Sequence, residues 1–210
     1  MPRLLFRTQS LIALFCGAML AVCLCSCGNN DTSRAQWEVT QAFESWKNAV
    51  IGQQNDQAMI YIPKDVDDYL ATLNSSAAPE TKAPPSQSPG VDLLLRTALV
   101  RKVPADLRTN LTLATLWQRI TDRHLFNPRD VREIDLGRIS VNGKRATAEL
   151  YYQGALTALR LPFIKESNVW KIDVMAILPD AELLMRVDRA IKRETEEQQV
   201  DELVSKLPSL

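Results

Sequence analysis

The chain has 210 residues, of which 25 are basic and 25 acidic, so its formal net charge at neutral pH is 0. No block of basic residues stands out along it, which argues against a nucleic-acid-binding surface or an electrostatic membrane patch. The length is sufficient for one domain with a hydrophobic core.

The start of the chain has the parts of a secretory signal. Arg3 and Arg7 give it a positive end, and the apolar run 11–24 follows. This run is shorter than the roughly 20 residues that a membrane-spanning helix needs, and it fits the apolar part of a signal peptide. Without these two arginines the chain keeps 23 basic and 25 acidic residues, a net charge of −2.

The segment Leu24–Cys27 (LCSC) resembles the bacterial lipobox, which has Leu at −3, a small residue at −1 and Cys at +1. Cleavage before either preceding cysteine would place a bulky residue at −1, so the register before Cys27 fits best. The resemblance implies that residues 1–26 are removed and that Cys27 carries a diacylglyceryl thioether, with an acyl group such as palmitate on its new amino terminus. An ordinary cleaved signal without lipid and an uncleaved anchor are the alternatives.

A lipid on Cys27 would confine the protein to the bacterial cell envelope, because two or more acyl chains anchor stably. Gly28 at +2 is not Asp, so in a Gram-negative cell the resemblance implies the outer membrane, facing the periplasm. Residues 27–33 would form a lipidated tether and residues 34–210 a single domain.

Cysteine usage limits the chemistry of that domain. Cys16, Cys23 and Cys25 would leave with the signal, and Cys27 would be acylated. We therefore expect no disulfide, no thiol chemistry and no thiolate-ligated zinc site in the mature protein.

The first half of the domain has the apolar spacing of helices. Ser33 and Gln36 have the spacing of a capping box, and Gly52 suits a helix end. Asp56 can cap a second, short helix that ends before Pro63. Apolar residues at helical spacing predict the first helix and three later ones: Val39, Phe43, Trp46 and Val50; Val66, Tyr69, Leu70 and Leu73; Val91, Leu94, Leu95, Ala98 and Leu99; Leu113, Leu116, Trp117 and Ile120.

Residues 74–89 are rich in Pro and Ser and have no apolar periodicity. They predict a disordered, exposed loop, because they cannot bury enough apolar surface to offset the entropy of ordering. The helices beyond it form an insertion that runs to about residue 133.

The pattern then alternates, which predicts an antiparallel meander of about four strands. A bulge near Gly137 reconciles the phases of 134–136 and 139–141, and Asn142-Gly143 predicts a type I′ hairpin. The expected core-facing residues are Ala146, Ala148, Leu150 and Tyr152, then Leu159, Leu161 and Phe163, and, after a turn at Ser167-Asn168, Trp170, Ile172, Val174 and Ala176.

Pro179 and Asp180 open a long final helix with two apolar stripes, one at Leu184, Val187 and Ile191 and one at Val200, Leu203, Val204 and Leu207. The wholly polar segment 193–199 between them predicts a solvated middle section. The tail beyond it either folds back or meets a partner.

The order of elements resembles the nuclear transport factor 2-like superfamily of α+β cones, in which helices pack into a curved antiparallel sheet. The likeness lies in Ala35–Ile62 and Ile134–Ile177, above all in the stretches 144–148, 162–166 and 170–172. Lys64–Glu133 is much longer than such domains carry there, and the final helix is an addition. The alternative fold is a helical domain capped by a simple meander.

Few residues suggest catalysis, although the resemblance implies that an enzyme would hold Asp, His or Tyr in the cone. The one histidine, His124, fits an ordinary polar helix end better than a general base. Tyr151 and Tyr152 fit core packing, and Asp173 fits a surface pair with Lys171. The carboxylates of Asp67, Asp68, Glu194, Glu196 and Glu197 fit solvated helix faces, since calcium-loop spacing is absent.

The sequence therefore predicts no catalytic residue, no cofactor, no metal ligand and no nucleic-acid partner, with lipidation at Cys27 as the one site. The preferred function is a membrane-anchored, non-catalytic envelope lipoprotein. It would bind a protein partner through the C-terminal helix, or a small apolar ligand in the cone. The alternatives are a small-molecule isomerase or hydrolase that uses the cone pocket, and a structural component of an envelope assembly.

Overall fold

The computed structural model describes residues 31–75, 88–123 and 128–210. The chain divides into two compact units, Met1–Glu38 and Val39–Leu210. The segment 31–51 is helical, and within the first unit Arg34 and Glu38 form an ion pair of 3.2 Å one turn apart. The prediction that Ser33 caps this helix is wrong, because the two residues before Ser33 are already helical.

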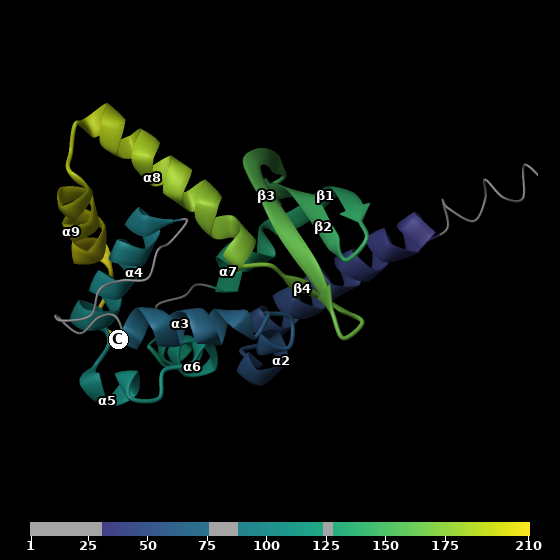
Figure 1. Cartoon of the computed structure of the whole chain (residues 1–210). Coiled ribbons are helices and arrows are strands. Elements are labelled where there is room, and N and C mark those ends of the chain that lie inside the picture. Colours follow the sequence, from purple (N-terminus) through teal and green to yellow (C-terminus); the bar gives the residue numbers. More distant parts are fainter. Residues whose placement is uncertain (1–30, 76–87, 124–127) are drawn as a thin grey trace, which may run out of the picture. The chain divides into compact units, whose positions relative to one another are not determined.

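The second unit is a mixed α+β structure, as predicted (Figure 1). Its elements in chain order, after the helix that ends at residue 51, are α2 (Asn55–Met59), α3 (Asp65–Ser75), α4 (Pro89–Lys102), α5 (Ala105–Arg108), α6 (Leu113–Asp122), α7 (Pro128–Arg132), β1 (Ile134–Asn142), β2 (Arg145–Tyr152), β3 (Ala155–Glu166), β4 (Val169–Ile172), a 3₁₀ turn (Met175–Ile177), α8 (Leu178–Lys192) and α9 (Glu196–Lys206).

The predicted helices are present, with shifted ends. The first helix stops at Gly52 as expected, but the left-handed residue is Gln53, whose φ is 55°. Asp56 lies inside the first turn of α2 and does not cap it, since the N-cap is Gln54. The short helices α5 and α7 have no apolar period long enough to predict them.

The segment 74–89, predicted as a loop, is helical at both of its ends. Residues 74 and 75 complete α3, and Pro89 begins α4, where a missing N–H costs nothing. The prediction of disorder for the residues between, 76–87, lies outside the described residues.

The sheet is the predicted antiparallel meander, with strand order β1-β2-β3-β4 (green in Figure 1). The register of β1 against β2 shifts between Leu136 and Ile139, which confirms the bulge around Gly137. Ala146 and Ala148 of β2 and Phe163 of β3 are buried, as the alternation requires. At the other end of this hairpin Tyr152 and Leu159 are exposed, contrary to the prediction, because the strands extend beyond the core there.

The first hairpin turn is one residue later than predicted. Asn142 still pairs with Arg145, so the turn residues are Gly143 and Lys144. Only Gly143 has a positive φ, of 60°, which is the pattern of a type II′ turn with Gly first. A type I′ pattern occurs instead at Ser167 and Asn168, whose φ values are 47° and 66°.

β4 is shorter than predicted, because it ends at Ile172. The Ile172 amide donates to the carbonyl of Tyr61 (2.8 Å), and the chain then turns into the 3₁₀ segment. Val174 and Ala176 therefore do not continue the strand, although Trp170 and Ile172 are buried as expected.

The final helix is two helices and not one. Arg193 adopts a left-handed conformation (φ 59°) that ends α8, and Thr195 starts α9 with a capping box to Gln198. In Figure 1, α9 returns alongside α4, so the tail folds back. Gln199, in the segment predicted to be solvated, is only 1% exposed.

Among the described residues, two apolar clusters join helices of the second unit. One joins the first helix to α2 and α7, through Ala49, Val50, Ala58 and Val131. The other joins α3, α4 and the segment before α6, through Leu73, Leu99, Val103 and Leu111. The apolar side of α9, with Val200 and Val204, is also buried.

The bulge at Gly137 yields a test of the sheet. A Cβ atom on this residue would lie 2.5 Å from Cε2 of the Tyr151 ring, closer than atoms pack. We expect Gly137→Ala to lower the free energy of unfolding by about 1–3 kcal/mol, measured by urea denaturation. Ser140→Ala, on the exposed side of β1, is the control and should change it little.

A double-mutant cycle isolates the cause. If the Tyr151 ring is responsible, the loss caused by Gly137→Ala should shrink in a Tyr151→Leu background. An equal loss in both backgrounds would show that the backbone of the bulge, and not the ring, requires glycine.

Candidate functional site: an apolar cavity

A cavity of about 280 Å³ lies between the first helix, α2, α6 and the sheet. Every lining side chain in the described part of the chain is apolar: Phe43, Trp46, Met59, Ile62, Leu113, Trp117, Ile134, Leu150, Leu161, Ile172 and Val174. Each of the four strands contributes at least one of these residues. The cavity is therefore a product of the sheet's inward face and the helices opposite it.

The first helix is fixed against the sheet by a buried ammonium group. Lys47 Nζ donates to the carbonyl of Ile134 (2.5 Å) and to the carboxylate of Asp135 (2.9 Å), so its charge is paired. On the same helix, the rings of Phe43 and Trp46 pack with centroids 5.8 Å apart, and both side chains line the cavity. The contacts of Lys47 therefore hold the part of the helix that carries these two rings next to β1.

The opposite wall is fixed by a carboxylate from another helix. Asp67 in α3 accepts a hydrogen bond from the amide of Leu113 (2.6 Å), the first residue of α6. Thr112 and Thr115 add a capping box at the same end. The prediction that Asp67 is a solvated charge is wrong. Its carboxylate caps α6 and positions Leu113 and Trp117 in the cavity wall.

The described wall of the cavity offers no acid or base. Asp173 is adjacent in sequence to the wall residue Val174, but its carboxylate accepts from the amide of Ala176 (3.1 Å) and lies 3.4 Å from Arg145. Its predicted surface pairing with Lys171 is wrong, because Asp173 is buried at the end of β4. Lys171 pairs instead with Glu166, at 3.1 Å.

The other candidate residues also lie away from this wall. Tyr151 packs against the bulge at Gly137, and Tyr152 is exposed. His124 lies outside the described residues. Among the described residues, no group of three His, Cys, Asp or Glu side chains is placed to hold a metal ion.

A second hollow, of about 270 Å³, lies on the sheet and is polar, with Arg138, Thr147, Glu149 and Arg160 among its lining residues. Arg138 and Glu149 form an ion pair of 3.2 Å across β1 and β2. Arg138 is mostly exposed, and a pair of this kind contributes little to stability or binding. The hollow is an ordinary charged surface of a sheet.

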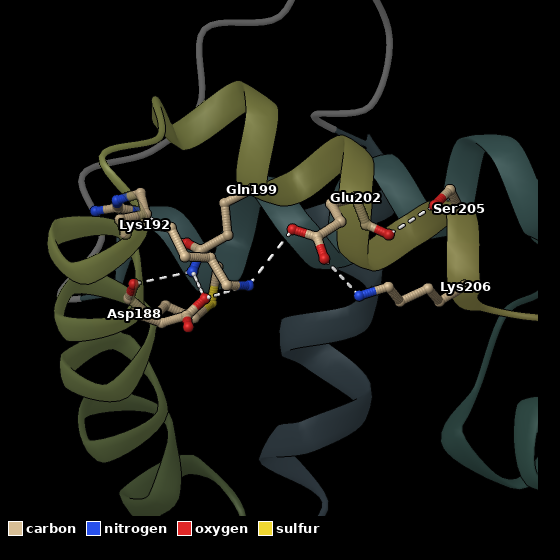
Figure 2. Close-up of polar contacts among 8 residues, drawn as sticks. Asp188, Lys192, Gln199, Glu202, Ser205 and Lys206 are labelled. Carbon is tan, nitrogen blue, oxygen red and sulfur yellow. Dashed lines mark hydrogen bonds and ion pairs between the residues drawn. The ribbon is translucent and has the colours of Figure 1, made fainter.

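Glu182, the most deeply buried charged side chain of the described residues, belongs to a structural cluster between α4, α8 and α9. Glu182 is 2% exposed, and its carboxylate accepts from the amide of Val91 (3.0 Å) in the first turn of α4. Arg189 lies 3.3 Å from Glu196. Gln199 donates to the carbonyl of Met185 (3.0 Å) and to Asp188 (2.9 Å), beside which it lies in Figure 2. These groups satisfy one another and fasten three helices.

Sequence reasoning missed the cavity and these buried charges. Apolar spacing predicts a core position for most wall residues, but not for Met59 or Ile62, and it does not show where packed side chains leave a gap. Glu182 and Asp67 sit at ordinary helical spacing, so nothing local indicates that each caps a helix distant in sequence.

Among the described residues, Tyr69 has the pKa that is shifted furthest from its ordinary value. Burial, and then a hydrogen bond of 2.5 Å from its hydroxyl to the carboxylate of Asp92, raise the pKa of Tyr69 far above its ordinary value of 10. The pair links α3 to α4. It lies within a helix–helix contact and away from the cavity, so it is structural.

This pair predicts an alkaline loss of stability. Because the pKa of Tyr69 is raised in the folded state, the contribution of this tyrosine to the free energy of unfolding is complete below pH 10. As the pH rises above 10, the tyrosine ionises in the unfolded chain but not in the folded one, and this contribution is lost. Tyr69→Phe should therefore be less stable than the wild type at pH 8, and the difference should shrink by pH 11. Urea denaturation at both pH values measures it, with Tyr152→Phe, an exposed tyrosine, as the control. An unchanged difference would contradict the assignment.

None of the helices in the described ranges is both long and apolar enough to cross a membrane. No protein-family model, curated protein or solved structure matches the chain. What the protein does is therefore inferred from its own residues.

Proposed function

We propose that this protein is a lipid-anchored bacterial envelope protein that binds a small apolar ligand in the cavity and does not act as an enzyme. The observation that supports ligand binding is the wall of eleven apolar side chains. Cavities lined in this way stay dry and admit apolar molecules, because the transfer of apolar surface out of water is favourable. The anchor is supported by the lipobox-like segment that ends at Cys27.

The size of the cavity limits the ligand. A volume of about 280 Å³ is at the lower end of the range for small-molecule sites. Since one water takes up about 30 Å³ of liquid, there is room for roughly nine or ten carbon-sized groups. A short hydrocarbon chain or a two-ring aromatic molecule fits this limit, and a charged head would remain unpaired against the wall.

The enzymatic alternative requires at least two polar groups in the cavity, and the described wall supplies none from its side chains. Proton transfer needs an acid or base within about 3 Å of the reacting atom. Ligand binding is therefore the better supported use of the site. The likeness to the nuclear transport factor 2-like cone stays a prediction beside it.

A partner of the C-terminal helix has less support. The apolar side of α9 is already packed, with Val200 and Val204 buried. Deleting residues 200–210 would therefore remove part of the core and should not be used as a neutral probe of partners. Four exposed apolar residues of the C-terminal region, Leu183, Leu184, Val187 and Ile191, lie on α8 instead, and Leu207 lies just after α9.

Binding can be tested with two probes of matched shape. We expect naphthalene to bind and to change the fluorescence of Trp46 and Trp117, which line the cavity. 1-Naphthoate should bind at least about tenfold more weakly, because its carboxylate would enter an apolar wall unpaired. Fluorescence titration of the full chain measures both.

A pair of variants on one strand provides the control. Leu161→Phe narrows the cavity and should weaken naphthalene binding, whereas Leu156→Phe is the same change at an exposed position of β3 and should not. Circular dichroism checks that both variants are folded. No naphthalene binding by the wild type, or equal binding by the two variants, would contradict the proposal.

The anchor has its own test. In bacteria supplied with labelled palmitate, the wild type and Cys25→Ala should incorporate label, and Cys27→Ala should not, because the thioether forms on the residue after the cleavage site. Gel fluorography of the immunoprecipitated protein measures the label. Absence of label from the wild type would favour an ordinary cleaved signal, and label on Cys27→Ala would place the lipid elsewhere.

A further inference from the structure

The helical side of the apolar cavity is rich in aromatic rings. In the described part of the chain, the aromatic lining residues are Phe43 and Trp46 from the first helix and Trp117 from α6. Aromatic residues make up 6% of the chain, but they are three of the eleven lining residues. We name Phe43, Trp46 and Trp117 the aromatic wall.

The sheet side of the cavity is aliphatic. Its described lining residues are one from each strand and one just beyond β4: Ile134, Leu150, Leu161, Ile172 and Val174. We name these five residues the aliphatic wall. The cavity thus has aromatic rings on its helical side and branched hydrocarbon side chains opposite them.

The residues of the aromatic wall lie close to one another. The ring centroids of Phe43 and Trp46 are 5.8 Å apart and the rings are inclined by 34°, within the range of about 4.5–7 Å at which aromatic rings attract. Trp46 and Trp117 pack against the same apolar cluster, which includes Val50 and Ala58. A ring placed in the cavity would therefore meet aromatic side chains from two helices.

The aromatic wall can distinguish ligands that the aliphatic wall cannot. Aromatic rings attract one another beyond what the burial of area supplies, because the negative face of one ring meets the positive edge of another. A saturated hydrocarbon lacks this distribution of charge and gains from burial alone. Contacts with the aromatic wall therefore favour an aromatic ligand.

An acyl chain fits the cavity less well than a fused ring. A chain of about ten carbons loses the freedom of its rotatable bonds when it binds, whereas a fused ring is already rigid. The acyl chain of a lipid also carries a polar head, and the described lining side chains include no charged group to pair with it.

We propose that the ligand of the cavity is a neutral, planar aromatic molecule of about two fused rings, selected by Trp46 and Trp117. This inference rests on the proposed function, that the cavity binds a small apolar ligand, and it narrows that ligand to one chemical class. The two tryptophans are the specificity-determining residues, and Phe43 supports the ring of Trp46.

Naphthalene and trans-decalin separate aromatic character from burial. Both have ten carbons in two fused rings, but decalin is saturated and has more apolar surface, so burial alone favours decalin. We expect the wild-type full chain to bind naphthalene more tightly than trans-decalin. Headspace gas chromatography measures the free concentration of each volatile hydrocarbon above the protein, with a protein-free sample in the same buffer as the blank.

Two substitutions at one position isolate the contribution of the ring. Trp117→Leu and Trp117→Phe introduce side chains of similar volume, but only the second keeps an aromatic ring. The ratio of the dissociation constant of decalin to that of naphthalene should fall at least about fivefold in Trp117→Leu and stay within about twofold of the wild type in Trp117→Phe. If circular dichroism shows that either variant is unfolded, Trp46→Leu and Trp46→Phe replace the pair.

The outcomes distinguish this inference from the proposed function. Tighter binding of decalin than of naphthalene by the wild type would overturn the inference and leave the binding of apolar ligands intact. Equal ratios for the two substitutions of the folded pair would overturn it in the same way. Binding of neither hydrocarbon would overturn the proposed function as well.

Discussion

The buried carboxylate of Glu182 is the constraint on which the C-terminal half of the structure depends. A carboxylate that is removed from water must find donors, and this one accepts from Val91 at the positive end of α4. The contact sets the rotation of α8 about its own axis, and that rotation leaves Leu183, Leu184, Val187 and Ile191 in solvent. Without it, α8 would be expected to turn its apolar side inward, as an amphipathic helix ordinarily does.

The cavity depends on a comparable use of charge at the other end of the unit. Lys47 secures the first helix to β1, and Asp67 secures α6 to α3, so both walls are held by polar contacts outside the cavity itself. Of the described residues, those that line the space between are all apolar. Polar groups thus determine the geometry of a site whose chemistry is entirely apolar.

The elements that were predicted correctly depend on local patterns. The meander and its bulge follow from alternation around Gly137, and α3, α4 and α6 follow from helical spacing. The errors arose where a distant residue decides the outcome. The surface prediction for Asp173 fails because nothing local shows that β4 ends at Ile172. The prediction of a solvated segment 193–199 fails because the burial of Gln199 requires α8 to lie across it. The cavity was not predictable for the same reason, although most of its wall residues lie in apolar patterns that predict a core.

The caps of α4 and α6 also bear on how the chain acquires its structure. Glu182 is 91 residues beyond Val91, and Asp67 is 46 residues before Leu113. Contacts between residues so far apart form late, since the entropy of closing the loop must be overcome first. During synthesis the first turn of α4 therefore lacks its acceptor until α8 has left the ribosome. The α4–α8 contact thus belongs to the last stage of folding and makes the stability of α4 conditional on the C-terminal helices.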